Sequence, residues 1–144
     1  MIDPVTLART LHGHLGLLAA IALLHPAITL RGAARLRPGT RFSVAGATAL
    51  VTLATALGWW LYPGYRSADK PRLLQSAFPV AQLFETKEHL AFYALALAWA
   101  GCGLALATEG ARARRVARWS FGAAGALALL VGALGTVVGS ASAG

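Results

Sequence analysis

The sequence has 144 residues, of which 57% are hydrophobic and 12% charged, and its formal net charge is +8. Soluble domains carry about a quarter charged residues, so this composition excludes an ordinary water-facing surface. The length allows one compact unit, a single domain over residues 1–144. The basic excess does not indicate nucleic-acid binding, because most arginines gather in two short segments where membrane topology explains them.

Four nearly uncharged stretches predict transmembrane helices, over about residues 4–30, 42–62, 84–108 and 117–139. Each is long enough to cross a hydrocarbon core about 30 Å thick at about 1.5 Å per residue. The predicted fold is therefore all-α, an integral membrane four-helix bundle. Asp3 followed by Pro4 is typical of an N-cap and a first helical residue, so the first helix is expected to begin there.

The first helix carries His12, His14 and His25. His12 and His14 are separated by about 200° around a helix, so they cannot both face one partner. His14 and His25 share a face, and we expect that face to look inward because two polar groups are hidden from lipid there. Pro26 removes a backbone hydrogen bond, and the favoured role of His25 is to bond the carbonyl that this proline frees.

The segments between the helices differ in charge. Residues 31–41 and 109–118 are rich in arginine, whereas the longer connection, 63–87, dilutes its basic residues with Asp69 and Glu85. The positive-inside rule places the two arginine-rich segments in the cytoplasm and both termini outside, in the cell inner membrane. The arginines concerned are Arg31, Arg35, Arg37, Arg41, Arg112, Arg114, Arg115 and Arg118.

Prolines near both ends of the long connection indicate where the flanking helices end and begin. Tyr62-Pro63-Gly64 predicts a turn at the end of the second helix, and Pro79 is a candidate start for the third. Around that turn lie Trp59, Trp60, Tyr62 and Tyr65, an arrangement typical of an interfacial aromatic belt.

His89 stands near the start of the third span, and the first and third helices both start outside. His89 is therefore expected at the depth of His12 and His14. Two histidines at one depth on two helices are the arrangement that ligates a b-type haem axially. The partner of His89 can be either His12 or His14, and the shared face with His25 favours His14.

With these three histidines in a four-span bundle, the chain resembles the small cytochrome b subunits that anchor redox enzymes. The resemblance implies one b-type haem near the outer face, electron exchange with the quinone pool, and a soluble redox partner outside. The chain would then be an electron conduit within an oxidoreductase complex and not an enzyme by itself.

Glu85, Glu88 and His89 support a second interpretation. Glu85 and His89 share a helix face and, with His12 or His14, can form a non-haem metal site through nitrogen and carboxylate oxygen. The alternative is that Glu85, Lys87 and Glu88 form the water-exposed start of the third helix. Glu88 is also a candidate to accept a proton when a quinol is oxidised.

Two classes without a cofactor remain open: a scaffold or assembly subunit whose histidines only pack, and a small transporter. Glycines recur along the fourth helix, including Gly135 and Gly139. Small residues let membrane helices approach closely, so this helix is predicted to join the chain to a partner or a second copy.

Overall fold

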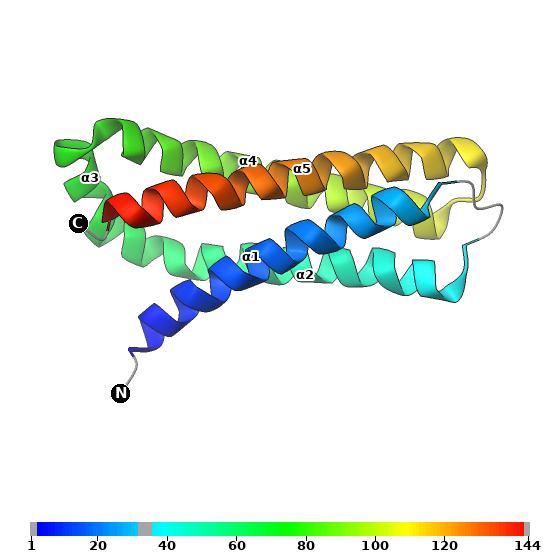
Figure 1. Cartoon of the computed structure of the whole chain (residues 1–144), viewed down its shortest axis with the longest axis horizontal. Helices are drawn as coiled ribbons and strands as arrows, with labels where there is room; N and C mark the ends of the chain where they lie inside the picture. Colours follow the sequence, from blue (N-terminus) through cyan, green and yellow to red (C-terminus); the bar gives the residue numbers. More distant parts are fainter. Residues whose placement is uncertain (1–2, 32–35, 143–144) are drawn as a thin grey trace.

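The computed structural model describes residues 3–31 and 36–142, and all regular structure in these ranges is helical. The long helices are α1 (Pro4–Thr29), α2 (Pro38–Gly64), α4 (Phe78–Ala107) and α5 (Ala111–Ser142); a π-helical turn, η1 (Tyr65–Asp69), and the short α3 (Lys70–Ser76) follow α2. The four long helices form one elongated bundle (Figure 1). The all-α prediction is confirmed, and each of the four is long and apolar enough to cross a membrane.

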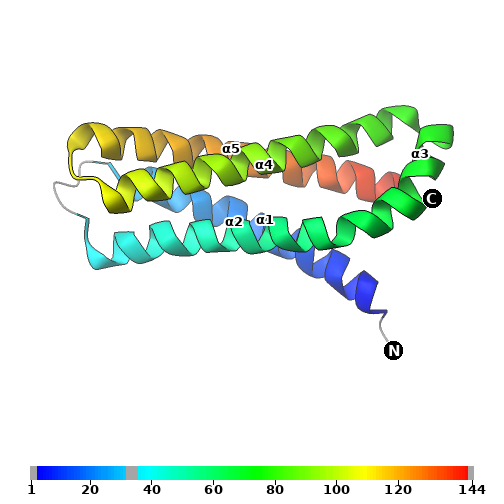
Figure 2. The same ribbon diagram turned by 180° about the vertical axis from the view of Figure 1, so that it is seen from behind.

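The long helices form a four-cornered bundle. α1 packs against α2 and α5, and α4 packs against α5 and α2, so α1 and α4 occupy opposite corners (Figures 1 and 2). Both ends of the chain lie at one end of the bundle together with α3, here called the terminal end. The links between α1 and α2 and between α4 and α5 lie at the other, the arginine end; Arg35 falls outside the described residues.

The start of α1 follows the prediction. The Thr6 backbone N–H and hydroxyl both donate to Asp3 Oδ2, at 2.9 and 3.0 Å, and Pro4 is the first helical residue. The same hydrogen bonds hold the pKa of the Asp3 carboxyl below its ordinary value, because they favour the charged form. The N-terminal part of α1 leans away from the other helices (Figure 2).

The predicted turn at Tyr62-Pro63-Gly64 is wrong. α2 continues through Pro63 to Gly64, and η1 and α3 carry the helical path on to Ser76. Proline has a helix-compatible φ and removes only one ladder bond, and the π turn absorbs the local disturbance. The Ser67 hydroxyl also donates to the Pro63 carbonyl at 3.0 Å. The chain reverses later, at Ala77, where φ is −150° and ψ is 58°.

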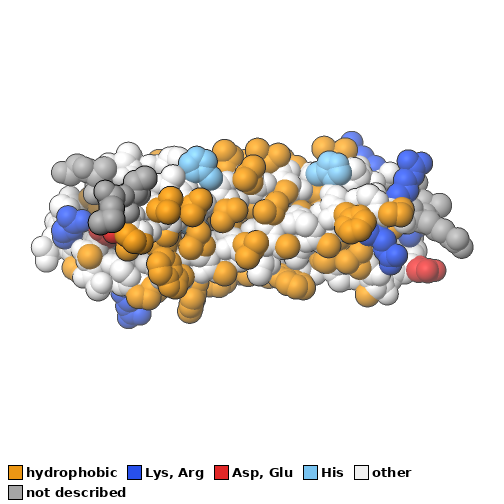
Figure 3. Space-filling view, turned by 90° about the horizontal axis from the view of Figure 1, so that it is seen from below, with side chains coloured by type: hydrophobic (Ala, Val, Ile, Leu, Met, Phe, Trp, Pro, Cys, Tyr) orange, Lys and Arg blue, Asp and Glu red, His pale blue; other side chains and the backbone are white. Residues whose placement is uncertain are grey.

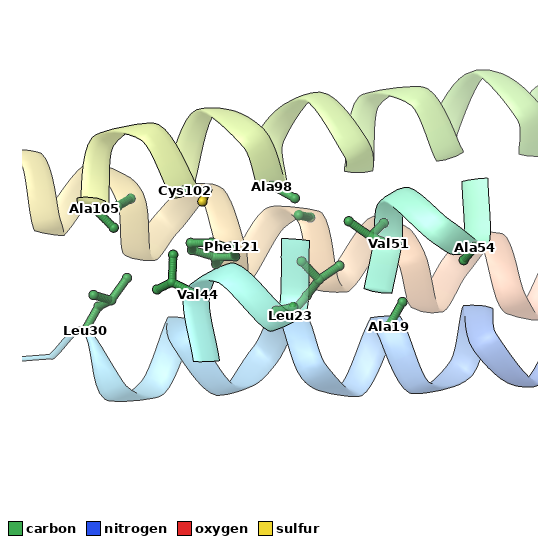
Figure 4. Close-up of a cluster of buried hydrophobic side chains, with 13 residues drawn as sticks. Ala19, Leu23, Leu30, Val44, Val51, Ala54, Ala98, Cys102, Ala105 and Phe121 are labelled. Atoms are coloured by element: carbon green, nitrogen blue, oxygen red, sulfur yellow. The ribbon is translucent and has the colours of Figure 1, made fainter. Parts of the chain in front are cut away.

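The core is built mainly from small residues. Leu23, Val44 and Phe121 are its largest fully buried apolar side chains apart from a proline, and alanines such as Ala98 surround them (Figure 4). A Cβ added to Gly101 would lie 3.1 Å from the Phe121 ring, so this aromatic ring fits only because a glycine faces it. Such packing lets apolar helices approach closely without a polar surface.

Candidate functional site

Three of the four histidines are exposed. Nδ1 of His14 lies 2.8 Å from the Thr10 carbonyl oxygen, and Nδ1 of His89 lies 2.7 Å from the Glu85 carbonyl oxygen. Each ring thus lies back along its own helix, on an exposed face, and the two helices stand at opposite corners. The structure does not bring His14 and His89 around a shared interior slot.

The expectation that His14 and His25 face inward is wrong. The inward side of α1 is formed by Ala19, Leu23 and Pro26, and both histidines lie on the opposite, exposed side. Figure 3 shows histidine rings among hydrophobic side chains at the molecular surface. Nδ1 of His25 lies 2.6 Å from the Ser43 hydroxyl oxygen on α2, so its partner is not the carbonyl freed by Pro26.

His12 is the histidine that turns toward the bundle. It lies on the same side of α1 as Ala19 and Leu23, and it is half-buried. Its Nδ1 donates to the Ala54 carbonyl oxygen of α2 at 3.0 Å, because a carbonyl can only accept. A Cβ added to Gly58 would lie 2.7 Å from His12 Cε1, so the ring occupies space that only a glycine leaves free.

Lys87 of α4 also turns its side chain toward the bundle interior. It lies seven residues before the buried Ala94, two helical turns away, and therefore points to the inward side. A Cβ on Gly135 of α5 would lie 3.8 Å from Lys87 Cδ, and Lys87 Nζ lies 4.5 Å from the centre of the Phe84 ring. No hydrogen bond or ion pair to Lys87 Nζ occurs within residues 3–31 and 36–142.

His12, Gly58, Lys87 and Gly135 together form what we call the polar core. Each long helix contributes one of its members, and Lys87 lies within electrostatic reach of the His12 ring. Two basic side chains thus enter the interior of an apolar bundle near its terminal end, each facing a glycine. Ionisable groups at such positions usually belong to a substrate or proton site.

Ion pairs at the terminal end connect the helices near the polar core. The Asp69 carboxylate, at the end of η1, lies 2.9 Å from the Arg9 guanidinium and 3.0 Å from that of Arg72. Lys70 Nζ lies 2.6 Å from Glu85. These contacts tie α1, α3 and α4 together. The buried Tyr65 hydroxyl has no hydrogen-bond partner in the described part of the chain.

The acidic residues of the predicted metal site are not assembled with histidines. Glu85 is bonded to Lys70, Glu88 is half-buried beside Lys87, and His89 is exposed. Among the described residues, no group of three or more His, Cys, Asp or Glu side chains is close enough to hold a metal ion. Glu85 and His89 do share a face of α4, but His89 is exposed at the corner opposite α1, so neither His12 nor His14 joins them.

The sequence interpretation also missed the role of Lys87, which it assigned to a wetted helix start. The signal was the helical phase: Lys87 aligns with the buried small residues Ala94, Ala98 and Ala105 of α4, whereas His89 aligns with exposed positions such as Tyr93 and Ala96. No family model, no curated protein and no solved structure matches the chain. Its function is therefore inferred from its own residues.

Proposed function

We propose that the chain is a multi-pass protein of the cell inner membrane with both termini outside the cytoplasm. Four long apolar helices support this, as do the large hydrophobic side chains exposed around them, such as Ile21, Leu53 and Trp99. The charge asymmetry supports the orientation, because Glu109 is the one acidic residue near seven described arginines at the arginine end.

Within that membrane, we propose that the protein is a redox subunit that binds a quinone headgroup at the polar core and connects the quinone pool to a redox partner outside. The observation that supports this proposal is that the side chains of Lys87 and His12 both point into the bundle, from helices at opposite corners. A quinone presents two carbonyl oxygens that need donors in an otherwise apolar site, and a charged donor makes the stronger bond. The ammonium of Lys87 is the donor available for a quinone carbonyl, and the unprotonated Nε2 of His12 can accept a hydrogen bond from a quinol hydroxyl.

Glu88 is the proposed proton acceptor for this reaction. When a quinol is oxidised, its hydroxyl protons must leave together with the electrons. Glu88 is half-buried next to Lys87, one helical turn along α4 from the Glu85–Lys70 ion pair. A carboxylate in this position can take up the proton and release it to the outer surface.

The b-type haem remains a second proposal, with one observation in its favour. His12, His14 and His89 each direct Nδ1 to a backbone carbonyl. This fixes the proton on Nδ1 and leaves Nε2 as a potential iron ligand, the arrangement common among metal-binding histidines. The placement of the residues does not fit a haem held inside one chain, because His89 is exposed at the corner opposite α1. Ligation by His89 and His14 or His12 would need a rearranged α1 or a second copy.

A spectrum separates the haem proposal from the quinone proposal. The full chain, purified from cells supplied with haem, is assayed as the pyridine haemochrome. Haem ligation predicts a low-spin spectrum that His89→Ala abolishes and that His25→Ala, the matched control on α1, leaves intact. A haem-free wild-type protein removes the haem proposal and leaves the quinone proposal standing.

The quinone proposal is tested with a short-chain quinone analogue titrated into the purified protein, with tryptophan fluorescence as the readout. Lys87→Met should weaken binding by roughly tenfold or more, because a hydrogen bond to a charged group is worth about 1.5–3 kcal/mol. Lys70→Met is the control, since it removes the same charge at the same end, outside the polar core. If the wild type binds no quinone, the protein is better described as a cofactor-free scaffold. If both variants bind quinone as the wild type does, the quinone site does not lie at the polar core.

A further inference from the structure

The arginine end carries positive charge that no carboxylate neutralises. Within residues 3–31 and 36–142 the ion pairs involve Asp69 and Glu85, both at the terminal end, and Glu109 makes none. The described arginines here are Arg31, Arg37, Arg41, Arg112, Arg114, Arg115 and Arg118. Membrane orientation explains their number, but it does not explain their arrangement.

The way α1 packs against α5 places two of these arginines, Arg31 and Arg118, at a similar height along the bundle. A Cβ on Gly122 would lie 3.8 Å from Ala27 Cβ, and a Cβ on Gly125 would lie 2.7 Å from Leu24 Cδ2. The two helices run antiparallel (Figure 1), so Arg118 lies one turn beyond Gly122 toward the arginine end. Arg31 lies four residues beyond Ala27 toward the same end, just past the last residue of α1, Thr29. Like charges thus stand at the same level on the two sides of one helix seam.

Arg114 extends this arrangement by one more turn of α5, on the same face as Arg118. Both are half-buried, whereas Arg31 is exposed. α5 also begins at this end, with no acidic residue in its first turn. The positive end of its dipole therefore adds to the repulsion among the arginines. The seam would be stabilised by an external anion.

An apolar surface continues from the seam toward the middle of the bundle. Ile28 and Ile21 of α1 are 60% and 57% exposed. Trp119 is 64% exposed, with the Arg118 guanidinium 4.9 Å from its ring centre. A ligand that matches this surface has an anionic head at the arginines and a hydrocarbon tail along α1.

We propose that the α1–α5 seam at the arginine end is a binding site for an anionic phospholipid, with its phosphate held by Arg31 and Arg118 and supported by Arg114. Guanidinium groups bind phosphate through paired N–H donors, and two of them on opposite sides of a seam can hold one diester. The acyl chains lie on Ile28 and Ile21. The proposal rests on the membrane placement above and is independent of quinone binding.

Native mass spectrometry of the full chain in detergent tests the site. The protein is exposed to equal amounts of phosphatidylglycerol and phosphatidylcholine, and the lipid retained per chain is measured. The wild type should retain phosphatidylglycerol preferentially. Arg31→Gln with Arg118→Gln should weaken that binding by about fivefold per arginine, roughly twenty-five-fold in all. The matched control is Arg37→Gln with Arg41→Gln, which removes the same charge at the same end but at the start of α2.

The controls distinguish a specific lipid site at the seam from general attraction of anionic lipid by the arginine end. An equal loss in the two double variants would overturn the seam site, and so would equal retention of the two lipids by the wild type. Displacement of phosphatidylglycerol by millimolar inorganic phosphate would show that the seam binds a free anion and not a lipid. Because cysteine labelling reports orientation separately, failure of the lipid site would leave the membrane placement untouched.

Discussion

At the scale of single residues, glycines decide where polar groups can enter this bundle. Gly58 and Gly135 stand opposite His12 and Lys87, and in both cases a side chain on the glycine would meet the basic residue. Gly135 therefore packs inside its own bundle, which argues against its use as a contact for a partner helix. Gly132 and Gly139 of α5 have open space around them and are better placed for such a contact.

Gly58→Ala should destabilise the protein by about 1–3 kcal/mol, the usual cost of overpacking a close contact. The new methyl group would lie 2.7 Å from His12 Cε1, so the ring must move and its bond to the Ala54 carbonyl is weakened. Thermal unfolding in detergent, followed by far-ultraviolet circular dichroism, measures the change.

Gly46→Ala is the matched control on the same helix, since nothing lies within 4 Å of a Cβ at that position. Alanine is the better helix former, so this variant should be unchanged or more stable by up to about 1 kcal/mol. Equal destabilisation by both substitutions would mean that His12 is not seated against Gly58.

At the scale of helices, the sequence predicted the four long elements because their apolar stretches are long, and it predicted the start of α1 because Asp3 and Pro4 are strong local signals. It could not predict which side of each helix faces inward. A helix exposed to lipid is apolar on both sides, so hydrophobicity does not distinguish them; residue size does. On α1 and α4 the inward side is mostly alanine and glycine, while leucines and aromatic residues lie outside. On α1, residue size alone would have selected His12 over His14. On α4 it separates the two sides less well, because the exposed side also carries Ala96, Ala100 and Gly103.

The N-terminal half of α1 is attached to the rest of the bundle partly through Asp69. We expect Asp69→Asn to weaken that attachment, because both Arg9 and Arg72 lose their anionic partner. The arginine side chains are 55% and 71% exposed, so solvent screening limits the loss to about 1 kcal/mol. Hydrogen exchange detected by mass spectrometry should become faster in residues 5–14.

Glu85→Gln provides the comparison, since Lys70 and Glu85 join α3 to α4 without involving α1. Exchange in residues 5–14 should then stay at the wild-type rate. Unchanged exchange in the Asp69 variant would show that packing of Ala8 and His12, and not the ion pair, holds α1 in place.

At the scale of the whole molecule, the two ends of the bundle differ in both charge and chemistry. Among the described residues, the arginines at the arginine end make no ion pairs. At the terminal end, Asp69 and Glu85 pair with Arg9, Arg72 and Lys70, next to a basic interior. Such a molecule has a preferred orientation in a membrane with a cytoplasmic surface. Orientation in turn decides which side of the membrane the proposed redox partner would have to occupy.

Cysteine labelling in intact cells measures that orientation. In a Cys102→Ala background, an impermeant maleimide should label Ser67→Cys, at the terminal end, and should reach Glu109→Cys only after the membrane is permeabilised. Both positions are exposed, so accessibility within the fold does not distinguish them. Labelling in the opposite order would invert the topology and place the polar core near the cytoplasm.

The aromatic side chains along the terminal half of α2 have an optical consequence. Trp59 stacks on Tyr62 at 6.3 Å between ring centres, Tyr62 stacks on Tyr65 at 6.4 Å, and Tyr65 stacks on Phe84 of α4 at 3.4 Å. Aromatic rings held in fixed positions against one another contribute to the near-ultraviolet circular dichroism of a folded protein. The ladder links α2, η1 and α4, so any event that separates α4 from the π turn must change this signal. The protein thus has an intrinsic spectroscopic probe at the terminal end, near the proposed quinone site, and no attached dye is needed to follow changes there.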